Sequence, residues 1–287
     1  MSVEKIAIVM DSTAYLPDEL TKELNIRTVY LNIVIDGNSY KEVIDMPLDK
    51  YYDYLKDPNN SFPTTSQPAI GEVVSCLEKL KEEGYTDVIA IALSSGISGT
   101  FSSYSVADLM VDGINVHPFD SEVACRPEGY YAIKAAGLIK EGKSSKEIIT
   151  ALNEMKKVSK AYFMADDLSH LQRSGRLSGA QAIVGNLLQV KPLLHFEDKV
   201  IVPFQKIRTY KKVVLRIYEL FDEFYQQHKD ENISVCVLHV DAIEKAEEIK
   251  NHIKEVYPNV NVEIDAISPV VSTHLGIGAI GFAWTIL

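Results

Sequence analysis

Hydroxyl and imidazole side chains gather in three separate turns of the chain, and an arginine, Arg176, lies in a fourth turn. The hydroxyl and imidazole residues are Thr64, Thr65 and Ser66, then Ser94, Ser95 and Ser98, and finally His274. If the fold brings these turns together, neutral donors beside one cation would bind a carboxylate or a phosphate. The same residues also permit a nucleophile pair, in which Ser98 attacks an acyl group and His274 takes its proton.

The turn over residues 94–100 gives the strongest of these signals. Residues 88–93 are a short apolar run typical of a buried strand, and residues 100–110 are patterned as a helix. At such a joint the free backbone N–H groups of the helix start favour an anion. We expect Gly96 and Gly99 to permit positive φ and the close approach of a ligand. The simpler alternative is that Ser94 or Ser98 only caps the helix.

The hydroxyls at residues 64–66 are enclosed by Pro63 and Pro68, so the backbone there should be extended and stiff. Pro68 is placed to open a helix predicted over residues 69–83. One of the three hydroxyls is expected to cap that helix. A single cap does not require three hydroxyls, so a binding role stays open beside it.

A serine hydrolase would need an acid to orient His274, and Asp120 or Asp265 could supply it. The segment Gly96-Ile97-Ser98-Gly99 resembles a nucleophile elbow but does not match G-x-S-x-G. From the residues alone, an anion-binding protein and a hydrolase acting on acyl esters both remain open.

Residues 137–144 match the phosphate-binding pattern G-x-x-x-x-G-K-[ST] letter for letter. A true loop of this kind follows a strand, whereas residues 132–140 are helix-patterned. Gly142 is suited to end that helix, and Ser144 with Glu147 forms a capping box for the next one. The pattern therefore indicates a helix–Gly–helix joint and not an ATP site.

The elements that must position these residues divide the chain into two halves. In residues 1–160, strands are expected over residues 6–10, 28–35, 88–93 and 114–119, with helices over residues 17–24, 47–55, 69–83, 100–110 and 128–141. This alternation predicts an N-terminal α/β domain with a parallel sheet and helices on both faces, and with ligands at the carboxyl ends of its strands.

Residues 161–287 follow a different order and predict a C-terminal α/β domain with a mixed sheet. Strands are expected over residues 161–165, 190–196, 199–208, 233–240 and 260–267, and helices over residues 167–173, 177–189, 213–225 and 242–257. The second and third of these strands form a hairpin that turns at Glu197 and Asp198, and the others need crossovers. We expect the ligand to bind between the two domains.

The composition excludes several classes of protein. A net charge of −11 over 287 residues argues against nucleic-acid binding. Three distant cysteines form no C-x-x-C, so we expect a cytoplasmic protein with free thiols and neither a metal site nor a cofactor. The weakly charged stretches at residues 88–107 and 275–287 are too polar and too short, respectively, for membrane insertion. Residues 173–212 nevertheless hold eight Lys or Arg and two acids, which gives either a solvated edge or a positive rim for an anionic ligand or an acidic partner.

Over its whole length the sequence resembles the DegV family of bacterial fatty-acid-binding proteins, which includes the FakB subunits of fatty acid kinase. The resemblance depends on Asp11-Ser12-Thr13, Thr65-Ser66-Gln67-Pro68, Ser94-Ser95-Gly96-Ile97-Ser98-Gly99-Thr100, Phe119-Asp120-Ser121, Gly175-Arg176, Lys191-Pro192, Arg208-Thr209 and Thr273-His274-Leu275-Gly276. Two segments depart from the family: Ser174 stands where members often have Gly, and Thr273-His274-Leu275-Gly276 replaces Ala-His-Thr-Gly.

The resemblance implies a carrier and not an enzyme. Such a protein encloses one long-chain fatty acid as its ligand and presents the carboxylate to a separate, ATP-binding kinase subunit. It then delivers the acyl phosphate to an acyltransferase of phospholipid synthesis. By this resemblance Thr65 and Ser98 hold the carboxylate, with His274 and Arg176 beside them, and Thr64, Ser66, Ser94 and Ser95 are secondary candidates. The basic residues Arg173, Lys206, Arg208, Lys211 and Lys212 are expected to dock the kinase.

Overall fold

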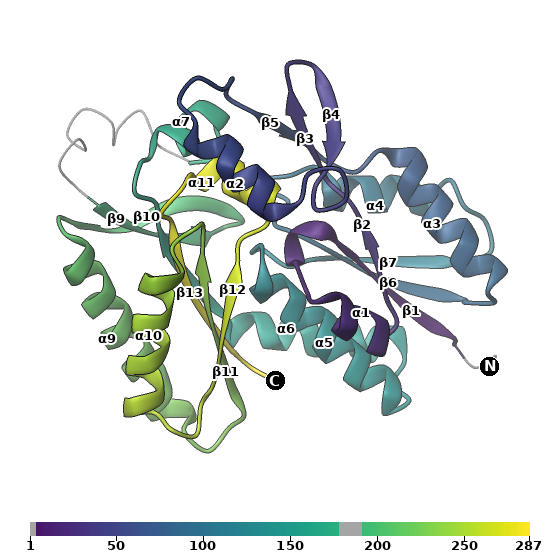
Figure 1. Ribbon diagram of the computed structural model, residues 1–287. Helices are drawn as coiled ribbons and strands as arrows, with labels where there is room; N and C mark the ends of the chain where they lie inside the picture. The colour runs from purple at the N-terminus through teal and green to yellow at the C-terminus, as the bar shows by residue number, and fades with distance from the viewer. Residues whose placement is uncertain (1–3, 178–190) are drawn as a thin grey trace.

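The computed structural model describes residues 4–177 and 191–287. Two large β-sheets lie side by side with helices between and outside them, and a small third sheet lies beside them (Figure 1). The helix predicted over residues 177–189 falls almost entirely outside the described residues.

The first sheet is parallel, as the alternation of strands and helices predicts. Its order is β2-β1-β6-β7, formed by Ile26–Val29, Ile6–Asp11, Asp87–Ala92 and Asn115–Asp120. Every residue of β1 and β6 is buried, because helices cover both faces of the central strands. The carboxyl ends of β1, β6 and β7 therefore meet at one edge, with Asp11, Ser94 and Asp120 together there.

Two pairs of helices cover this sheet. On one face lie α3 (Ile70–Glu82) and α4 (Thr100–Asp108), and α1 (Asp18–Glu23) packs beside β2. On the other face lie α5 (Arg126–Lys140) and α6 (Ser145–Val158). The joint between α5 and α6 confirms the prediction for residues 137–144: Gly142 has φ +77°, and Ser144 and Glu147 form a capping box. No strand precedes this segment, so it is not a phosphate-binding loop.

The second sheet is mixed, as predicted. Its order is β10-β9-β8-β13-β11-β12, formed by Val200–Ile207, Lys191–Glu197, Lys160–Met164, Ile280–Ile286, Ile233–His239 and Asn261–Ala266. The β9–β10 hairpin turns at Asp198 and Lys199, both with positive φ. The amphipathic helices α9 (Tyr210–His228) and α10 (Ile243–Val256) cover the outer face, while α5 and α6 contact the inner face.

Strand β13 was not predicted, although it lies at the centre of the second sheet. It pairs antiparallel with β8 and β11 and is buried over all but its last residue. A strand covered on both faces shows no alternation of polar and apolar residues, so residues 275–287 gave only a short apolar run.

The strand predicted over residues 28–35 is in fact two strands in different sheets. Strand β2 ends at Val29 in the parallel sheet. After Tyr30 and Leu31, β3 (Asn32–Ile35) forms a small antiparallel sheet with β4 (Asn38–Lys41) and β5 (Thr64–Ser66). The hydroxyls of residues 64–66 therefore lie on a strand and not in a cap.

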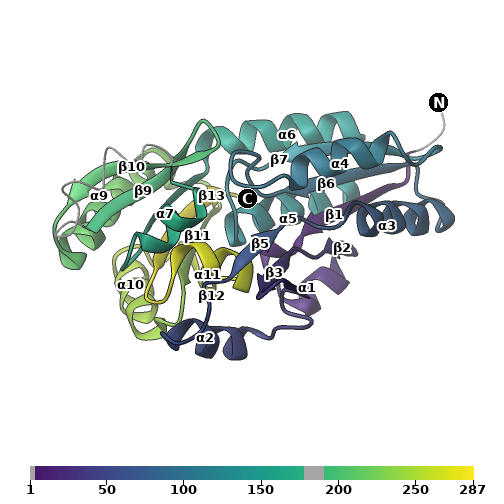
Figure 2. The ribbon, with the colours of Figure 1, turned by 90° about the horizontal axis from the view of Figure 1, so that it is seen from above.

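Three short helices lie beside the small sheet: α2 (Leu48–Lys56), α7 (Ser169–Ser174) and α11 (Pro269–Leu275). Helix α11 contacts α2, α7, β3 and β5, and seen from above it lies between the small sheet and β11 and β12 (Figure 2). The largest cluster of buried apolar residues includes Ile8 and Ile89 of the first sheet and Phe163 and Leu238 of the second. The division into domains at residue 160 stays a prediction.

Candidate ligand-binding site

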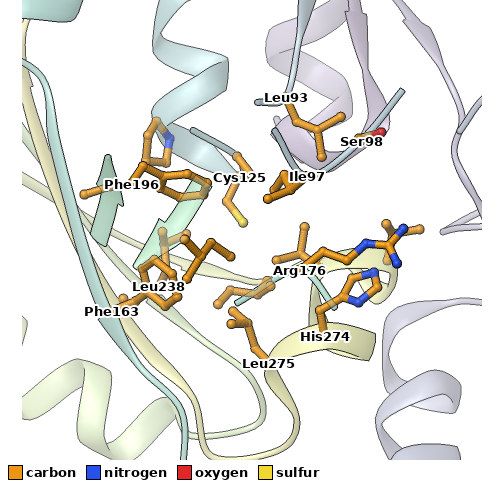
Figure 3. Close-up of a pocket in the computed structure, with 18 of the residues that line it drawn as sticks. Leu93, Ile97, Ser98, Cys125, Phe163, Arg176, Phe196, Leu238, His274 and Leu275 are labelled. Atoms are coloured by element: carbon orange, nitrogen blue, oxygen red, sulfur yellow. The ribbon is translucent and has the colours of Figure 1, made fainter. Parts of the chain in front are cut away.

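A cavity of about 330 Å³ lies where the two large sheets and the small sheet meet. Its walls come from both predicted domains, and most of them are apolar. The lining includes Thr65, Ser66, Gln67, Ile97, Ser98, Cys125, Phe163, Arg176, Phe196, Leu238, His274 and Leu275. Figure 3 shows this cavity in close-up.

The polar and apolar lining residues occupy different ends of the cavity. Ser98, Arg176 and His274 lie at one end, and Phe163, Phe196 and Leu238 lie at the other (Figure 3). Ser66 and Gln67 at the polar end are exposed, whereas Phe163 and Leu238 are buried. A ligand with a polar head and an apolar body would fit this arrangement with its head toward solvent.

Thr65 and His274 are joined by a hydrogen bond of 2.8 Å between Thr65 Oγ1 and His274 Nε2. Thr65 is held by the pairing of β5 with β3, and His274 is near the end of α11. Helix α11 is itself anchored through Thr273, whose hydroxyl bonds the buried Tyr51 hydroxyl at 2.5 Å. Two residues that are 209 positions apart thus meet at the polar end.

His274 is neutral in the unliganded protein. Burial, followed by the nearby Arg176 and His170, lowers the pKa of His274 to about 3. Its Nδ1 is buried and has no hydrogen-bond partner among the described residues. An anion at this end would favour the protonated form of the imidazole, because an opposite charge offsets the cost of burial.

Ser98 is positioned by the start of α4. Its Oγ lies 3.0 Å from Thr100 Oγ1 and accepts a longer bond of 3.3 Å from the Thr100 backbone N–H. The N-cap residue of α4 is Gly99 and that of α3 is Ala69, and neither uses a hydroxyl side chain. The expectation that one of residues 64–66 caps α3 is therefore wrong. Ser98 precedes the N-cap residue of α4 and contributes only the long bond from the Thr100 N–H.

Gly96 and Gly99 do not have the role predicted for them. Neither has positive φ. A Cβ at Gly96 would collide with the Lys199 carbonyl, and one at Gly99 would collide with the Gln67 side chain. These glycines let the turn pack closely against other parts of the protein and not against a ligand. Gly96 lies against the start of β10, and Gly99 lies against Gln67 after β5.

Arg176 follows Gly175, which ends α7 with φ +69°. Its guanidinium lines the cavity and donates a hydrogen bond of 2.6 Å to the Ser174 carbonyl. Since that bond engages Nη1, other N–H groups of the guanidinium can reach an anion in the cavity. Arg176 is the only cationic side chain among the described residues that line it.

The four main candidates, Thr65, Ser98, Arg176 and His274, all line this one cavity. Of the secondary candidates, Ser66 lines it as well. Thr64, Ser94 and Ser95 lie outside the lining. Ser94 donates to the Lys199 carbonyl at 2.6 Å, and Ser95 donates to Asp120 at 2.5 Å, so both stabilise the turn itself. That any of these residues binds a carboxylate stays a prediction.

The described residues do not assemble a hydrolytic triad. Ser98 bonds Thr100, while His274 bonds Thr65. The two candidate acids are engaged elsewhere, since Asp120 bonds Ser95 and Lys199 and Asp265 bonds Arg126. No cluster of three or more potential metal ligands occurs in residues 4–177 and 191–287.

The basic residues predicted to dock a partner are exposed. Lys206 is on β10, Arg208 follows it, and Lys211 and Lys212 are in the first turn of α9. Arg173 is separate from them, on α7, with its guanidinium 5.3 Å from the centre of the Phe62 ring. No helix in the described part of the chain is long and apolar enough to cross a membrane.

Sequence reasoning missed the apolar wall of the cavity and the side chain of Gln67. The wall residues, including Phe163, Phe196 and Leu238, belong to strands and look like any other core residues in the sequence. Gln67 lies against Gly99 and donates a bond of 2.7 Å to Ser103, which joins β5 to α4. Its position after three hydroxyls and before Pro68 was the available signal.

The chain is similar to known proteins over nearly its whole length. A family model described as "Uncharacterised protein, DegV family" matches residues 5–286. Protein DegV of Bacillus subtilis is 51% identical over 280 residues, which cover 97% of this chain and 98% of the relative. A DegV domain-containing protein of Listeria innocua is 47% identical over 283 residues, covering 99% of each.

Solved structures share the fold as well. The crystal structure of DegV from Bacillus subtilis, described as a fatty acid binding protein, matches with a TM-score of 0.93 at 49% identity, over 99% of this chain and 100% of that one. A fatty acid binding DegV family protein from Streptococcus agalactiae matches with a TM-score of 0.91 at 32% identity, over 99% of both chains.

Proposed function

The chain belongs to the DegV family, and from this premise we propose that it binds one long-chain fatty acid in the cavity described above. The acyl chain lies along Phe163, Phe196 and Leu238, and the carboxylate lies at the polar end. The protein acts as a carrier and not as a catalyst.

The observation on which this proposal depends is the separation of polar and apolar lining within one cavity. Each methylene group buried there contributes about 0.8 kcal/mol, so an acyl chain of sixteen carbons contributes on the order of 12 kcal/mol before the costs of association. The chain therefore supplies most of the affinity. The polar groups fix its orientation and offset the cost of removing a carboxylate from water.

Four side chains receive the carboxylate in this proposal. Thr65 and Ser98 donate hydroxyl hydrogen bonds, Arg176 supplies a charge-assisted bond, and His274 donates its Nε2–H to Thr65 Oγ1, which leaves the Thr65 proton for the carboxylate. The Thr65–His274 bond of 2.8 Å already holds two of these groups together. The site is thus largely formed before the ligand arrives, which reduces the entropy cost of binding.

We propose further that the bound carboxylate is presented to a separate kinase subunit. That subunit transfers the terminal phosphoryl group of ATP to a carboxylate oxygen, which leaves ADP and an acyl phosphate for an acyltransferase. The exposed position of Ser66 and Gln67 at the polar end supports access from outside. Lys206, Arg208, Lys211 and Lys212 form the basic docking surface for an acidic partner.

Mass spectrometry of lipid extracted from the purified protein tests the carrier proposal. We expect near-stoichiometric fatty acid in the wild type and less in Ser98→Ala, whose affinity falls about two- to twelvefold because it loses a hydroxyl donor. Ser102→Ala is the matched control, because Ser102 is exposed on α4, the helix that follows Ser98, and lies outside the cavity lining. A wild type that is empty and ignores added fatty acid would refute the proposal, as would turnover of acyl esters that Ser98→Ala abolishes.

The docking surface is tested by reversing its charge. In the presence of the kinase subunit and ATP, the variant with Lys206→Glu and Arg208→Glu should bind fatty acid normally but support slower acyl phosphate formation. Lys254→Glu, an exposed charge reversal on α10, should leave that rate unchanged. Equal rates for all three proteins would exclude this surface.

A further inference from the structure

The segment Asp11-Ser12-Thr13 lies outside the cavity lining, although its side chains are buried. Asp11 Oδ2 accepts a hydrogen bond of 2.7 Å from the Leu93 backbone N–H. Leu93 is followed directly by the turn that contains Ser98. Asp11 Oδ1 meanwhile accepts bonds of 2.9 and 2.6 Å from the N–H and hydroxyl of Thr13, which hold the carboxylate in place.

Ser12 connects two further elements. Its Oγ accepts a bond of 2.9 Å from the Leu31 backbone N–H and donates its proton to Oε1 of Glu42. Leu31 immediately precedes β3, and β3 pairs with β5 so that Ile33 lies opposite Thr65. The Ser12 hydroxyl is thus bonded to the residue that precedes β3, and β3 in turn pairs with β5, which contains Thr65.

Glu42 extends the connection to α11. Its second oxygen, Oε2, accepts a bond of 2.9 Å from the Val270 backbone N–H in the first turn of that helix. His274 follows Val270 by four residues, one turn farther along the same helix. Glu42 is fully buried, and both of its carboxylate oxygens are engaged.

We propose that Asp11, Ser12 and Glu42 are positioning residues that set the distances between Ser98, Thr65 and His274, three of the four side chains of the carboxylate site. We call them the positioning network. Asp11 holds the turn with Ser98, Ser12 holds the start of β3, which pairs with the Thr65 strand β5, and Glu42 holds α11 with His274. None of the three touches the cavity. The inference rests on the proposed function, because it assigns these residues to the same carboxylate site.

The energetics favour a positioning role over simple stabilisation. Neither Asp11 nor Glu42 has a Lys, Arg or His hydrogen-bond or ion-pair partner among the described residues, so two carboxyl groups are buried without charge compensation. Apolar residues of similar size would pack at lower cost. Carboxylates instead accept directional bonds from several elements at once, and that fixes geometry.

Ser12→Ala tests the network, because it removes the hydroxyl that joins Leu31 to Glu42. We expect fatty acid affinity to fall about tenfold while the protein stays folded. Ser234→Ala is the matched control: Ser234 is a buried serine on β11 outside the cavity lining. Glu42→Gln should lose less affinity than Glu42→Ala, since the amide oxygen can still accept the Val270 N–H bond.

A second measurement does not depend on fatty acid. The ¹⁵N shifts of the His274 ring, assigned with His274→Gln, report the bond of Nε2 to Thr65 in the unliganded protein. We expect Ser12→Ala to move these signals and Ser234→Ala to leave them in place.

The two measurements separate the possible failures. A wild type that binds no fatty acid would refute the proposed function, while moved His274 signals would still support the network. Unmoved His274 signals in Ser12→Ala, together with wild-type affinity, would refute the network and leave the carrier proposal standing.

Discussion

Arg176 and Arg173 are three residues apart, yet only Arg176 reaches the cavity. Arg173 is exposed and lies over the Phe62 ring. One arginine thus lines the cavity and the other does not. Substituting each in turn therefore distinguishes a direct contact with the ligand from a general effect of positive charge.

Arg176→Gln should weaken fatty acid binding about ten- to a hundredfold, because a charge-assisted bond to the carboxylate contributes about 1.5–3 kcal/mol. Arg173→Gln, which removes the same charge, should stay within about twofold of the wild type. Titration calorimetry with a long-chain fatty acid measures both. Similar losses in the two variants would mean that net charge, and not contact, explains the effect.

Phe196 lies between the ligand cavity and a second cavity of about 330 Å³. Tyr162 and Ala161 also line both, so the ends of the two cavities are separated by only a few side chains. The second cavity is more polar and includes Lys156 and Lys199. Under the proposed function, the Phe196 ring would therefore limit the length of the acyl chain in the first cavity.

Phe196→Ala should join the two cavities and shift the retained lipid toward longer chains. Each further methylene that becomes buried favours the longer acid about fourfold, from about 0.8 kcal/mol each. Phe204→Ala is the control, since Phe204 lines only the second cavity. Chain-length analysis of the bound lipid tests this prediction. An unchanged chain-length distribution in Phe196→Ala would contradict the role of Phe196 in limiting chain length.

At the scale of elements, α11 contributes most to the site, and glycine geometry fixes its end. Gly276 has φ +75°, and a Cβ there would lie 2.8 Å from the His170 ring on α7. Gly278 similarly faces Asp166. Both glycines therefore let the backbone after α11 lie close to residues of a neighbouring segment.

Gly276→Ala should lower the free energy of unfolding by about 2–4 kcal/mol, from backbone strain and from the contact with His170. Gly137→Ala is a matched substitution in α5 with open space around it, and should raise the same quantity by about 0.5–1 kcal/mol. Urea unfolding measures both changes. A neutral Gly276→Ala would show that the end of α11 is not constrained.

Sequence reasoning predicted helices that bury only one face, such as α9, and helices whose capping residues are visible in the sequence, such as α6. It failed where tertiary context decides. Strand β13 is buried on both faces and has no periodicity, and the segment from β2 to β3 changes sheet without any breaker residue. Helix α11 is too short for a helical pattern, although Pro269 at its start was a usable signal.

The sequence led to four main candidates that share one cavity, and their binding role stays a prediction. Thr65, Ser98, Arg176 and His274 were chosen for residue type and for turn position, and they line one cavity. The roles of Gly96, Gly99, Ser94 and Ser95 were misjudged, because a sequence does not reveal whether a small residue faces a ligand or another part of the protein.

At the scale of the whole molecule, buried carboxyl groups connect pH to stability. Burial raises the pKa of Glu42 from 4.5 to about 7, and burial also raises the pKa of Asp11 and Glu128. The titratable groups that interact with Glu42 from neighbouring elements are Asp11, Tyr15, Tyr30, Tyr51, Cys125 and Glu128. None of these neighbours is a cation that would favour ionised Glu42.

Between pH 4.5 and about 7 the folded protein keeps the Glu42 proton and the unfolded chain releases it. Raising the pH across this window therefore lowers the free energy of unfolding, by up to about 3 kcal/mol at about 1.4 kcal/mol per unit. Glu42→Gln lacks this term, so its stability relative to the wild type should rise from pH 5 to pH 8. Urea unfolding at pH 5 and pH 8 measures the free energy of unfolding of both proteins. A difference between them that does not change with pH would contradict the raised pKa of Glu42.

Unfolding should also occur in one step, because the largest apolar cluster includes residues of both large sheets. Trp284, the single tryptophan, is in β13 and reports on the second sheet. Its fluorescence transition in urea should coincide with that of far-ultraviolet circular dichroism. Separate midpoints would instead support independent domains divided near residue 160.

The separation of polar and apolar ends within the cavity has a consequence for the order of events. A fatty acid that fits with its head beside Ser66 and Gln67 must enter tail first, and it must leave head first. Under the proposed function, a reaction at the head group would therefore require neither release nor reversal of the chain. The positions of the hydroxyl groups at one end of the cavity therefore set the orientation of a bound chain.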